Sequence, residues 1–179
     1  MTYQDALRTS RVLEVLQRFD PTVVGTLPLN LAVATSDIDV VCEARDPNAF
    51  ADTVWDAYHQ FERFQLYRWR EERRPVIARF KLGDWPFELF ADPRPVAQQR
   101  AWRHFEVERR LLSLDDGLLR ATVARLRADG LKTEPAFARA LKLPGDPYEA
   151  MLELFQNSDA QLRAHLSTLN ARQDNVSDS

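Results

Sequence analysis

A short strand, loop and strand within Val23 to Glu43 constrains the fold of this 179-residue chain more than any other segment. Its initial β-branched run stops at Gly25, where the missing Cβ lets the backbone turn sharply or approach a ligand closely. Residues 37–42, Asp-Ile-Asp-Val-Val-Cys, then have the composition of a second strand. Because side chains alternate along a strand, Asp37 and Asp39 share one face and the opposite face is apolar core.

Carboxylates placed side by side point to a bound cation. Like charges this close raise each other's pKa unless a cation or strong donors lie between them, so we expect a hard divalent metal, Mg²⁺ or Mn²⁺. Glu88 is the single acid in the strand predicted over residues 85–91, and a metal held by the neighbouring strand would give it a partner. Two alternatives stay open: Glu88 faces solvent or pairs with Arg79 or Lys81, and the two aspartates are only a polar turn that leads into a strand.

The rest of the chain predicts helices around a mixed sheet of about five strands, an α/β (α+β) fold with a C-terminal helical region. We expect a core domain over residues 1–92, a helical region packed on it over 93–172, and a flexible tail over 173–179. The predicted elements are a helix over 3–19, a helix that begins at Asp46-Pro47, strands over 64–70, 76–82 and 85–91 with a polar turn over 71–75, and helices over 95–112, 118–128, from Thr133, and over 148–170.

Composition limits the partners. A 45% hydrophobic and 28% charged chain with a net charge of -3 is globular and does not coat nucleic acid through bulk charge. The basic residues of the hairpin could steer a phosphate, but a solvated hairpin face is the better interpretation: Arg68, Arg70, Arg73, Arg74, Arg79 and Lys81. A single cysteine, Cys42, together with the lack of an apolar run of membrane length, leads us to expect a cytoplasmic protein.

The helical half carries a second group of polar residues. His104 and Glu108 lie one turn apart on the helix predicted over 95–112, so His104 is a candidate general base or substrate contact. The alternative is a stabilising pair on the helix surface. We expect these residues, with Lys132 and Glu134, to line the same cleft as Asp39 and to contact an acceptor.

The spacing of the front motifs resembles a known superfamily. Gly25-Thr26 followed by Ser36-Asp37-Ile38-Asp39 is similar to the signature of nucleotidyltransferases, in which a Gly-Ser pair precedes an Asp-x-Asp pair by about ten residues. The resemblance implies that Gly25, Thr26 and Ser36 contact nucleotide phosphates, and that the aspartates and a third carboxylate hold Mg²⁺. Two departures are Thr26 in place of Ser and the apolar loop of residues 27–31.

The second half extends the resemblance to most of the chain, from about residue 25 to residue 154. The stretches QQRAWRHFEVERRLL and GLKTEPAFARALKLPGDPYEAMLEL resemble those of a bacterial family of unknown function with a nucleotidyltransferase-like fold. This implies transfer of a nucleoside monophosphate from a nucleoside triphosphate to an unidentified acceptor hydroxyl. The alternative, which the apolar loop motivates, is a catalytically inactive binding module or an antitoxin-like module.

Overall fold

The computed structural model describes residues 1–70 and 74–170, and contacts divide the chain into two compact units. The first unit, which we call the sheet unit, comprises Met1–Pro28 and Ala34–Trp102. The second, the helical unit, comprises Leu29–Val33 and the chain from Arg103 onward. Each unit has a core of its own. The domain division that the sequence predicts after residue 92 stays a prediction, because contacts alone do not show which parts fold independently.

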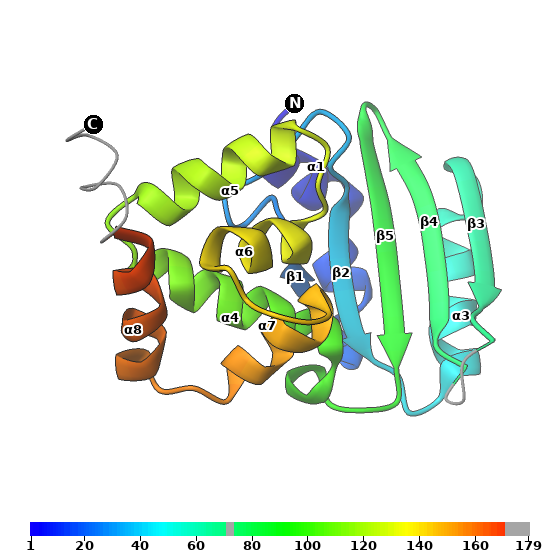
Figure 1. Ribbon diagram of the computed structural model, residues 1–179. Coiled ribbons are helices and arrows are strands. Elements are labelled where there is room, and N and C mark those ends of the chain that lie inside the picture. Colours follow the sequence, from blue (N-terminus) through cyan, green and yellow to red (C-terminus); the bar gives the residue numbers. More distant parts are fainter. Residues whose placement is uncertain (71–73, 171–179) are drawn as a thin grey trace. The chain divides into compact units, whose positions relative to one another are not determined.

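The sheet unit is built on a mixed sheet of five strands in the order β1-β2-β5-β4-β3 (Figure 1). Strands β2 and β5 are parallel, whereas the other neighbouring pairs are antiparallel. The strands are β1 (Thr22–Val24), β2 (Ile38–Glu43), β3 (Glu62–Arg68), β4 (Val76–Leu82) and β5 (Trp85–Asp92). This confirms the predicted mixed sheet of about five strands. The predicted turn over 71–75 falls partly on residues 71–73, which lie outside the described residues.

One face of the sheet packs against α1 (Tyr3–Ser10), α2 (Val12–Val15) and α3 (Pro47–Tyr58). Alternation along the strands sends every second side chain into this core. Its centre is a ring stack in which Tyr58 lies 4.4 Å from Phe80 and Phe80 lies 4.7 Å from Phe87, measured between ring centroids. The other face of β2, β4 and β5 is therefore the one that carries the polar residues of interest.

The N-terminal helical segment differs from its prediction. One helix over residues 3–19 is wrong: α1 ends at Ser10, α2 is short, and a 3₁₀ turn, η1 (Gln17–Phe19), follows. The break is at Arg11, whose φ of 54° is left-handed and cannot continue an α-helix. Ser10 supports the break, because its hydroxyl donates to the Leu7 carbonyl at 3.0 Å.

The helical unit contains α5 (Leu118–Ala128), α6 (Thr133–Leu141), α7 (Pro147–Phe155) and α8 (Asp159–Asn170), together with most of α4 (Arg100–Leu114). The helix predicted over 118–128 is confirmed, as is the helix start at Thr133. The start predicted at Pro95 is wrong, since a 3₁₀ turn, η2 (Val96–Gln98), precedes α4. The helix predicted over 148–170 is wrong in its continuity, since residues 156–158 separate α7 from α8. The predicted tail over 173–179 lies outside the described residues.

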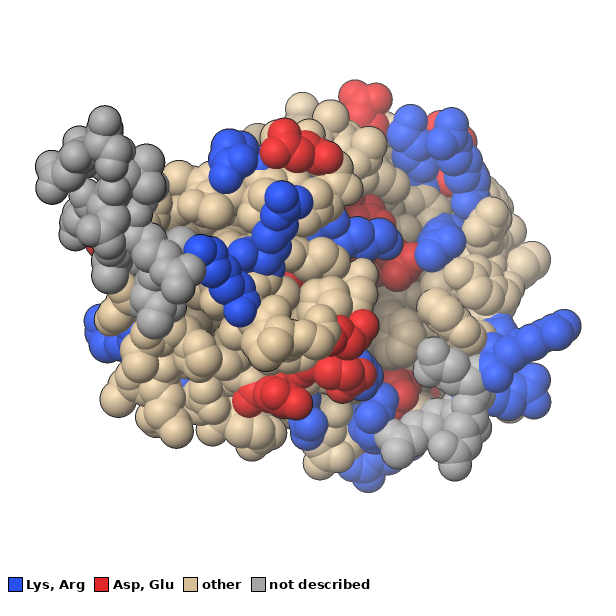
Figure 2. Space-filling model, viewed as in Figure 1, with Lys and Arg blue, Asp and Glu red and all other residues tan. Residues whose placement is uncertain are grey.

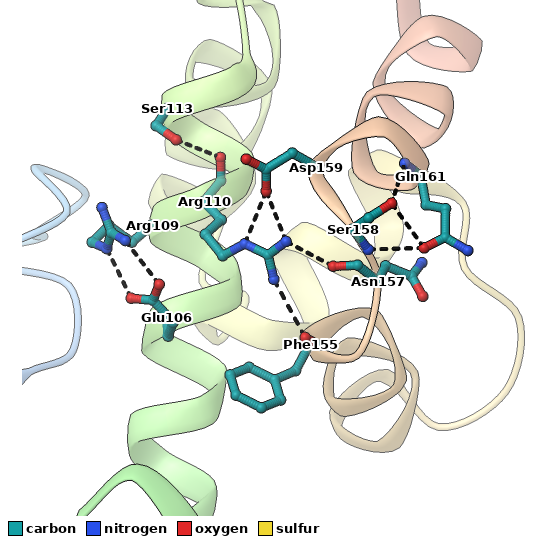
Figure 3. Close-up of polar contacts among 9 residues, drawn as sticks. All are labelled: Glu106, Arg109, Arg110, Ser113, Phe155, Asn157, Ser158, Asp159 and Gln161. Atoms are coloured by element: carbon teal, nitrogen blue, oxygen red, sulfur yellow. Dashed lines mark hydrogen bonds and ion pairs between the residues drawn. The ribbon is translucent and has the colours of Figure 1, made fainter.

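Arg110 fixes the turn between α7 and α8 (Figure 3). Its guanidinium donates to the Phe155 carbonyl at 3.3 Å, to the Asn157 carbonyl at 2.7 Å and to the Asp159 carboxylate at 2.7 Å. Ser158 begins α8 with a capping box: its amide donates to the Gln161 side chain at 2.8 Å, and the Gln161 amide donates back to the Ser158 hydroxyl at 3.3 Å.

The apolar loop of residues 27–31 is packed rather than solvated. Leu27 belongs to the core of the sheet unit, whereas Leu29 and Leu31, each 3% exposed, belong to the core of the helical unit. Arg120 on α5 donates to the Leu29 carbonyl at 2.6 Å. The leucines are thus core residues, which gives the loop a structural reason for its composition. Among the described helices, none combines the length and apolar character that a membrane crossing requires.

Candidate functional site

Gly25 shapes the first part of the site. It follows β1 with a φ of +79°, a conformation that residues with a side chain rarely adopt. A Cβ at this position would lie 2.3 Å from Oδ2 of Asp39, closer than any real contact. Strands β1 and β2 pair with Val24 opposite Asp39, so the turn backbone and the Asp39 carboxylate are held against each other. The glycine is therefore required for the place that Asp39 occupies.

The two ends of the following loop meet beside this turn. Thr26 is 8% exposed, and its hydroxyl donates to the Ser36 hydroxyl at 3.1 Å. The bond closes the loop of residues 27–35 immediately before Asp37. It brings Gly25, Thr26 and Ser36, the three residues assigned to phosphate contacts, into one short stretch of the sheet unit. Their contact with a phosphate stays a prediction.

Asp39 and Glu88 lie next to each other on neighbouring strands. The register of the parallel pair β2–β5 places Asp39 opposite Glu88, and paired residues present their side chains on the same face. The flanking residues Ile38, Val40, Phe87 and Leu89 all enter the core on the other face. Asp37, half-buried, comes two residues earlier, directly before β2 begins. The sheet therefore gathers the three predicted carboxylates around the start of β2.

Glu88 also forms an ion pair with Arg79, one of the two partners that the alternative interpretation of the sequence gave for it. Arg79 lies opposite Glu88 in the β4–β5 register and donates from Nε to Oε2 at 2.7 Å, while its Nη2 lies 2.5 Å from the same oxygen. The hydrogen bond to Glu88 is the largest cause of the raised pKa of the Arg79 guanidinium, and the negative charge of Asp37 adds to it. A protein cation thus already lies among these carboxylates.

The donor set fits a hard divalent cation in its chemistry. Three carboxylates with a glycine turn against one of them supply the oxygen ligands that Mg²⁺ and Mn²⁺ prefer. Within residues 1–70 and 74–170, no group of three or more His, Cys, Asp or Glu side chains is placed so that it could hold a metal ion. The hydrogen bond to Arg79 gives a physical reason for the position of Glu88.

The helical unit holds the second predicted group. Glu108 on α4 is 3% exposed, and its Oε1 has no hydrogen-bond partner among the described residues. Burial raises the pKa of the Glu108 carboxyl well above its usual value, the charge of Glu134 on α6 raises it further, and Arg127 on α5 opposes the rise. An acid in this setting is neutral at a pH where a solvated glutamate is ionised. Glu108 is therefore a buried acid and His104 is only 6% exposed, so the alternative of a pair on the helix surface is wrong for both residues.

A tyrosine that the sequence analysis missed belongs to this group. The His104 ring meets the Tyr148 ring edge-on at 6.2 Å between centroids, and burial followed by the charge of Glu134 raises the pKa of Tyr148. Tyr148 lies two residues after the helix cap at Asp146, so the sequence analysis treated it only as part of a helix start. Lys132 is exposed at the N-cap of α6. Whether this group lines a cleft with Asp39 and contacts an acceptor stays a prediction.

Two of the basic hairpin residues, Arg68 and Arg79, are engaged by other side chains. Arg68 donates to the Asn48 side chain at 2.6 Å, Arg79 is engaged by Glu88, and Arg73 lies outside the described residues. In Figure 2, blue and red side chains are interspersed over the described part of the visible face. The described surface in this view is consistent with the net charge of -3.

Comparison with known proteins gives a family and a fold. The family described as "Domain of unknown function (DUF4269)" matches residues 5–154. No protein of curated function matches the chain. Among solved structures, the Cid1 poly(U) polymerase bound to MgGTP is 19% identical, with a TM-score of 0.51 over 70% of this chain and 40% of that one.

Two further structures agree with this likeness. A Cid1 poly(U) polymerase mutant bound to MgATP is 16% identical, with a TM-score of 0.53 over 83% of this chain and 47% of that one. A cytoplasmic RNA terminal U-transferase is 15% identical, with a TM-score of 0.50 over 80% and 41% of the two chains. The chain spans less than half the length of these proteins. At this identity the likeness shows the fold, which is nucleotidyltransferase-like.

Proposed function

The chain belongs to the DUF4269 family, and from its nucleotidyltransferase-like fold and the carboxylates of its sheet we propose that it is a metal-dependent nucleotidyltransferase. It would transfer a nucleoside monophosphate from a nucleoside triphosphate to an acceptor hydroxyl. The observation that carries the proposal is the register of β2 and β5, which sets Asp39 beside Glu88 on the face opposite the core. The Gly25 turn against Asp39 supports it.

Each residue has a distinct part in this reaction. Asp37, Asp39 and Glu88 would hold one or two Mg²⁺ or Mn²⁺ ions, which when bound polarise the α-phosphate and lower the pKa of the acceptor hydroxyl. Gly25 keeps the Asp39 carboxylate in place, and the closed loop from Thr26 to Ser36 offers hydroxyl and backbone groups to the phosphates. The acceptor oxygen then forms a bond to the α-phosphorus while the bond to the pyrophosphate oxygen breaks.

The helical unit would contribute the acceptor contacts. His104, Glu108 and Glu134 come from two helices, and Glu108 and Glu134 are close enough for their charges to interact. Lys132, exposed at the start of α6, is free to meet an acceptor phosphate or carboxylate.

A transfer assay tests the proposal. The protein is incubated with each of the four α-labelled nucleoside triphosphates, Mg²⁺ or Mn²⁺, and a mixture of RNA, protein and small-molecule acceptors. We expect incorporation by the wild type and its loss in Asp39→Asn and Glu88→Gln. Asp84→Asn is the matched control, because Asp84 is exposed in the β4–β5 turn and loses the same charge. Equal incorporation by all four proteins would refute the assigned site.

A second candidate, an inactive binding module, is favoured by one observation. Arg79 already neutralises Glu88, as expected in a site that no longer needs a metal. Thermal melting of the wild type and of the double variant Asp37→Asn, Asp39→Asn separates the two functions. An enzyme gains apo stability in the variant and is stabilised by Mg²⁺ with nucleotide in the wild type. Destabilisation of the variant with no shift of the wild type on addition of metal or nucleotide would favour the binding module.

A further inference from the structure

Two exposed aromatic rings stand close together at the edge of the sheet. Tyr67 on β3 is 38% exposed, and Trp69, which follows β3, is 49% exposed. The pairing of β3 with β4 extends through Trp69, because the Trp69 amide donates to the Pro75 carbonyl at 2.9 Å. Side chains alternate along a strand, so the two rings share one face and lie about 7 Å apart along it.

This face of the sheet also carries the candidate carboxylates. The guanidinium carbon of Arg79 lies 6.0 Å from the centroid of the Tyr67 ring, so Tyr67 and Arg79 share a face. Arg79 lies opposite Glu88 in the β4–β5 register, and Glu88 lies opposite Asp39 in the β2–β5 register. The row of Asp39, Glu88 and Arg79 therefore leads across the sheet toward the two rings.

The other face of β3 belongs to the core. Phe64 packs against the core of the sheet unit, and its ring meets the Trp55 ring edge-on at 5.7 Å between centroids. Trp55 comes from α3, the helix that lies behind β3 and β4 in Figure 1. Trp55 is 52% exposed, so the sheet unit carries an exposed tryptophan on each side of β3.

Polar and basic residues surround the rings of Tyr67 and Trp69. Gln65 precedes Tyr67 on the same face of β3, and Arg79 and Lys81 lie on this face of β4. Ile77, the aliphatic residue paired with Tyr67, is 0% exposed and contributes nothing to the surface around the ring. Aromatic rings next to cations are the arrangement on which the bases of single-stranded nucleic acids stack.

The spacing of the rings suits a single strand better than one nucleotide. Two rings about 7 Å apart stand at roughly twice the 3.4 Å rise of one base in a duplex strand. Each ring can therefore take one base of a strand whose bases are separated from each other, as they are in single-stranded complexes. A nucleoside triphosphate has one base and would use only one ring. A duplex keeps its bases paired and stacked on each other.

We propose that Tyr67 and Trp69 form a stacking platform for two successive bases of single-stranded nucleic acid. This inference deepens the proposed function and rests on it in one respect: it names single-stranded nucleic acid as the acceptor. Stacking on the rings requires neither a metal ion nor a nucleoside triphosphate, so the platform can be tested apart from the transfer reaction. The chain has a net charge of -3, so stacking and not bulk charge supplies the selectivity for single strands.

The test measures binding of labelled oligonucleotides of about ten nucleotides by fluorescence anisotropy, in EDTA and at about 50 mM salt. The ligands are a mixed-sequence single strand, its duplex, and an abasic strand with the same phosphates. The proteins are the wild type, Tyr67→Ala, Trp69→Ala and Trp69→Phe. Trp55→Ala is the matched control, because it removes an exposed tryptophan from the α3 side. Circular dichroism confirms that each variant is folded.

A stacking platform gives a specific pattern of affinities. The wild type and Trp55→Ala should bind the single strand equally, and both should bind the duplex and the abasic strand more weakly. Tyr67→Ala and Trp69→Ala should each weaken binding of the single strand at least about fivefold, which corresponds to the loss of one base–aromatic stack. Trp69→Phe keeps a ring and should retain most of the affinity. The abasic strand should bind all variants alike.

Three results would overturn the platform. The first is no binding of the single strand by the wild type at about 0.1 mM protein, the weak end of ordinary non-specific binding. The second is equal binding of the mixed-sequence and abasic strands, which would mean that charge alone attracts the ligand. The third is the same loss in Trp55→Ala as in Trp69→Ala, which would mean that the rings of this face have no special part.

These failures are distinguishable from a failure of the proposed function. The binding assay contains no metal ion and no nucleoside triphosphate, so a negative result removes the platform and leaves transfer to another acceptor standing. Binding that follows the expected pattern, together with no incorporation of any labelled nucleotide in the transfer assay, would refute the enzyme and keep the platform as the surface of a nucleic-acid-binding module.

Discussion

Replacement of the buried acid in the helical unit, Glu108→Gln, should stabilise the protein increasingly as the pH rises. Burial, the charge of Glu134 and the counteracting charge of Arg127 set the pKa of the Glu108 carboxyl well above its usual 4.5. Between these two pKa values the unfolded chain releases the proton while the folded chain keeps it. The folded state thus loses stability as the pH rises through this interval, and glutamine, which does not ionise, removes the loss.

The size of the effect follows from the linkage of protons to folding. Inside the interval the free energy of unfolding of the wild type falls by at most about 1.4 kcal/mol per pH unit relative to the variant. The advantage of the variant should therefore grow by at most about 1.4 kcal/mol for each pH unit above the usual value, until the pH reaches the raised pKa of Glu108. At a pH below the usual pKa of a glutamate, the Glu108 carboxyl is protonated in both the folded and the unfolded state. The wild type and the variant then differ only through packing and hydrogen bonds at Oε1.

Urea unfolding at four or five pH values measures this slope. Glu153→Gln on α7 is the control, because Glu153 is exposed and the exchange removes the same charge. The control should follow the wild type at every pH. If the difference between Glu108→Gln and the wild type stays constant with pH, Glu108 has the same protonation in both states and our account of its burial is wrong. An advantage that shrinks as the pH rises would mean that Glu108 is held ionised by Arg127.

Three further predictions concern single positions. Gly25→Ala should lower the free energy of unfolding by more than the roughly 1 kcal/mol of a left-handed backbone, because the added Cβ would meet Asp39. In Gly130→Ala the added Cβ would meet no described atom within 4 Å, so this variant should lose only the backbone contribution in the same urea unfolding assay. Arg110→Ala should destabilise by about 1–3 kcal/mol and speed hydrogen exchange in the α7–α8 turn, which it hydrogen-bonds. Asp46→Ala should lose about 1 kcal/mol, because Asp46 caps α3; unchanged unfolding would contradict the cap.

Local patterns predicted most elements of the fold. The strand over 76–82 and the helix over 118–128 match their residues, because alternation and helical spacing there agree with burial. The break between α7 and α8 also had a signal: Ser158 and Gln161 have the spacing of a capping box, which a long apolar pattern obscured. The break at Arg11 had no such signal, because the residue type does not indicate that an arginine adopts a left-handed conformation.

The sequence predicted which face of each strand carries the candidate acids but not which strands pair, and their role as a site stays a prediction. Asp39 was identified because side chains alternate along a strand, and Glu88 because it is the single acid in its predicted strand. Their register depends on which strands become neighbours, and β2 pairs with β5, a strand that lies more than forty residues later and that only the tertiary fold selects. The burial of Glu108 in α4 also could not be predicted, because it depends on three helices and the helical periodicity around Glu108 does not indicate it.

The choice between enzyme and binding module now depends on one ion pair instead of a loop. The apolar residues 27–31 suggested that a phosphate-gripping loop had been lost, but Leu29 and Leu31 are buried in the core of the helical unit and are needed there whether or not a nucleotide binds. Packing accounts for the loop, so it does not weigh against catalysis. The Arg79–Glu88 pair does bear on the question, because it neutralises Glu88 without a metal and so favours the binding module. Its weight is small, since the Arg79 side chain is 49% exposed and an ion pair with this exposure contributes little free energy that a cation at Glu88 would have to overcome.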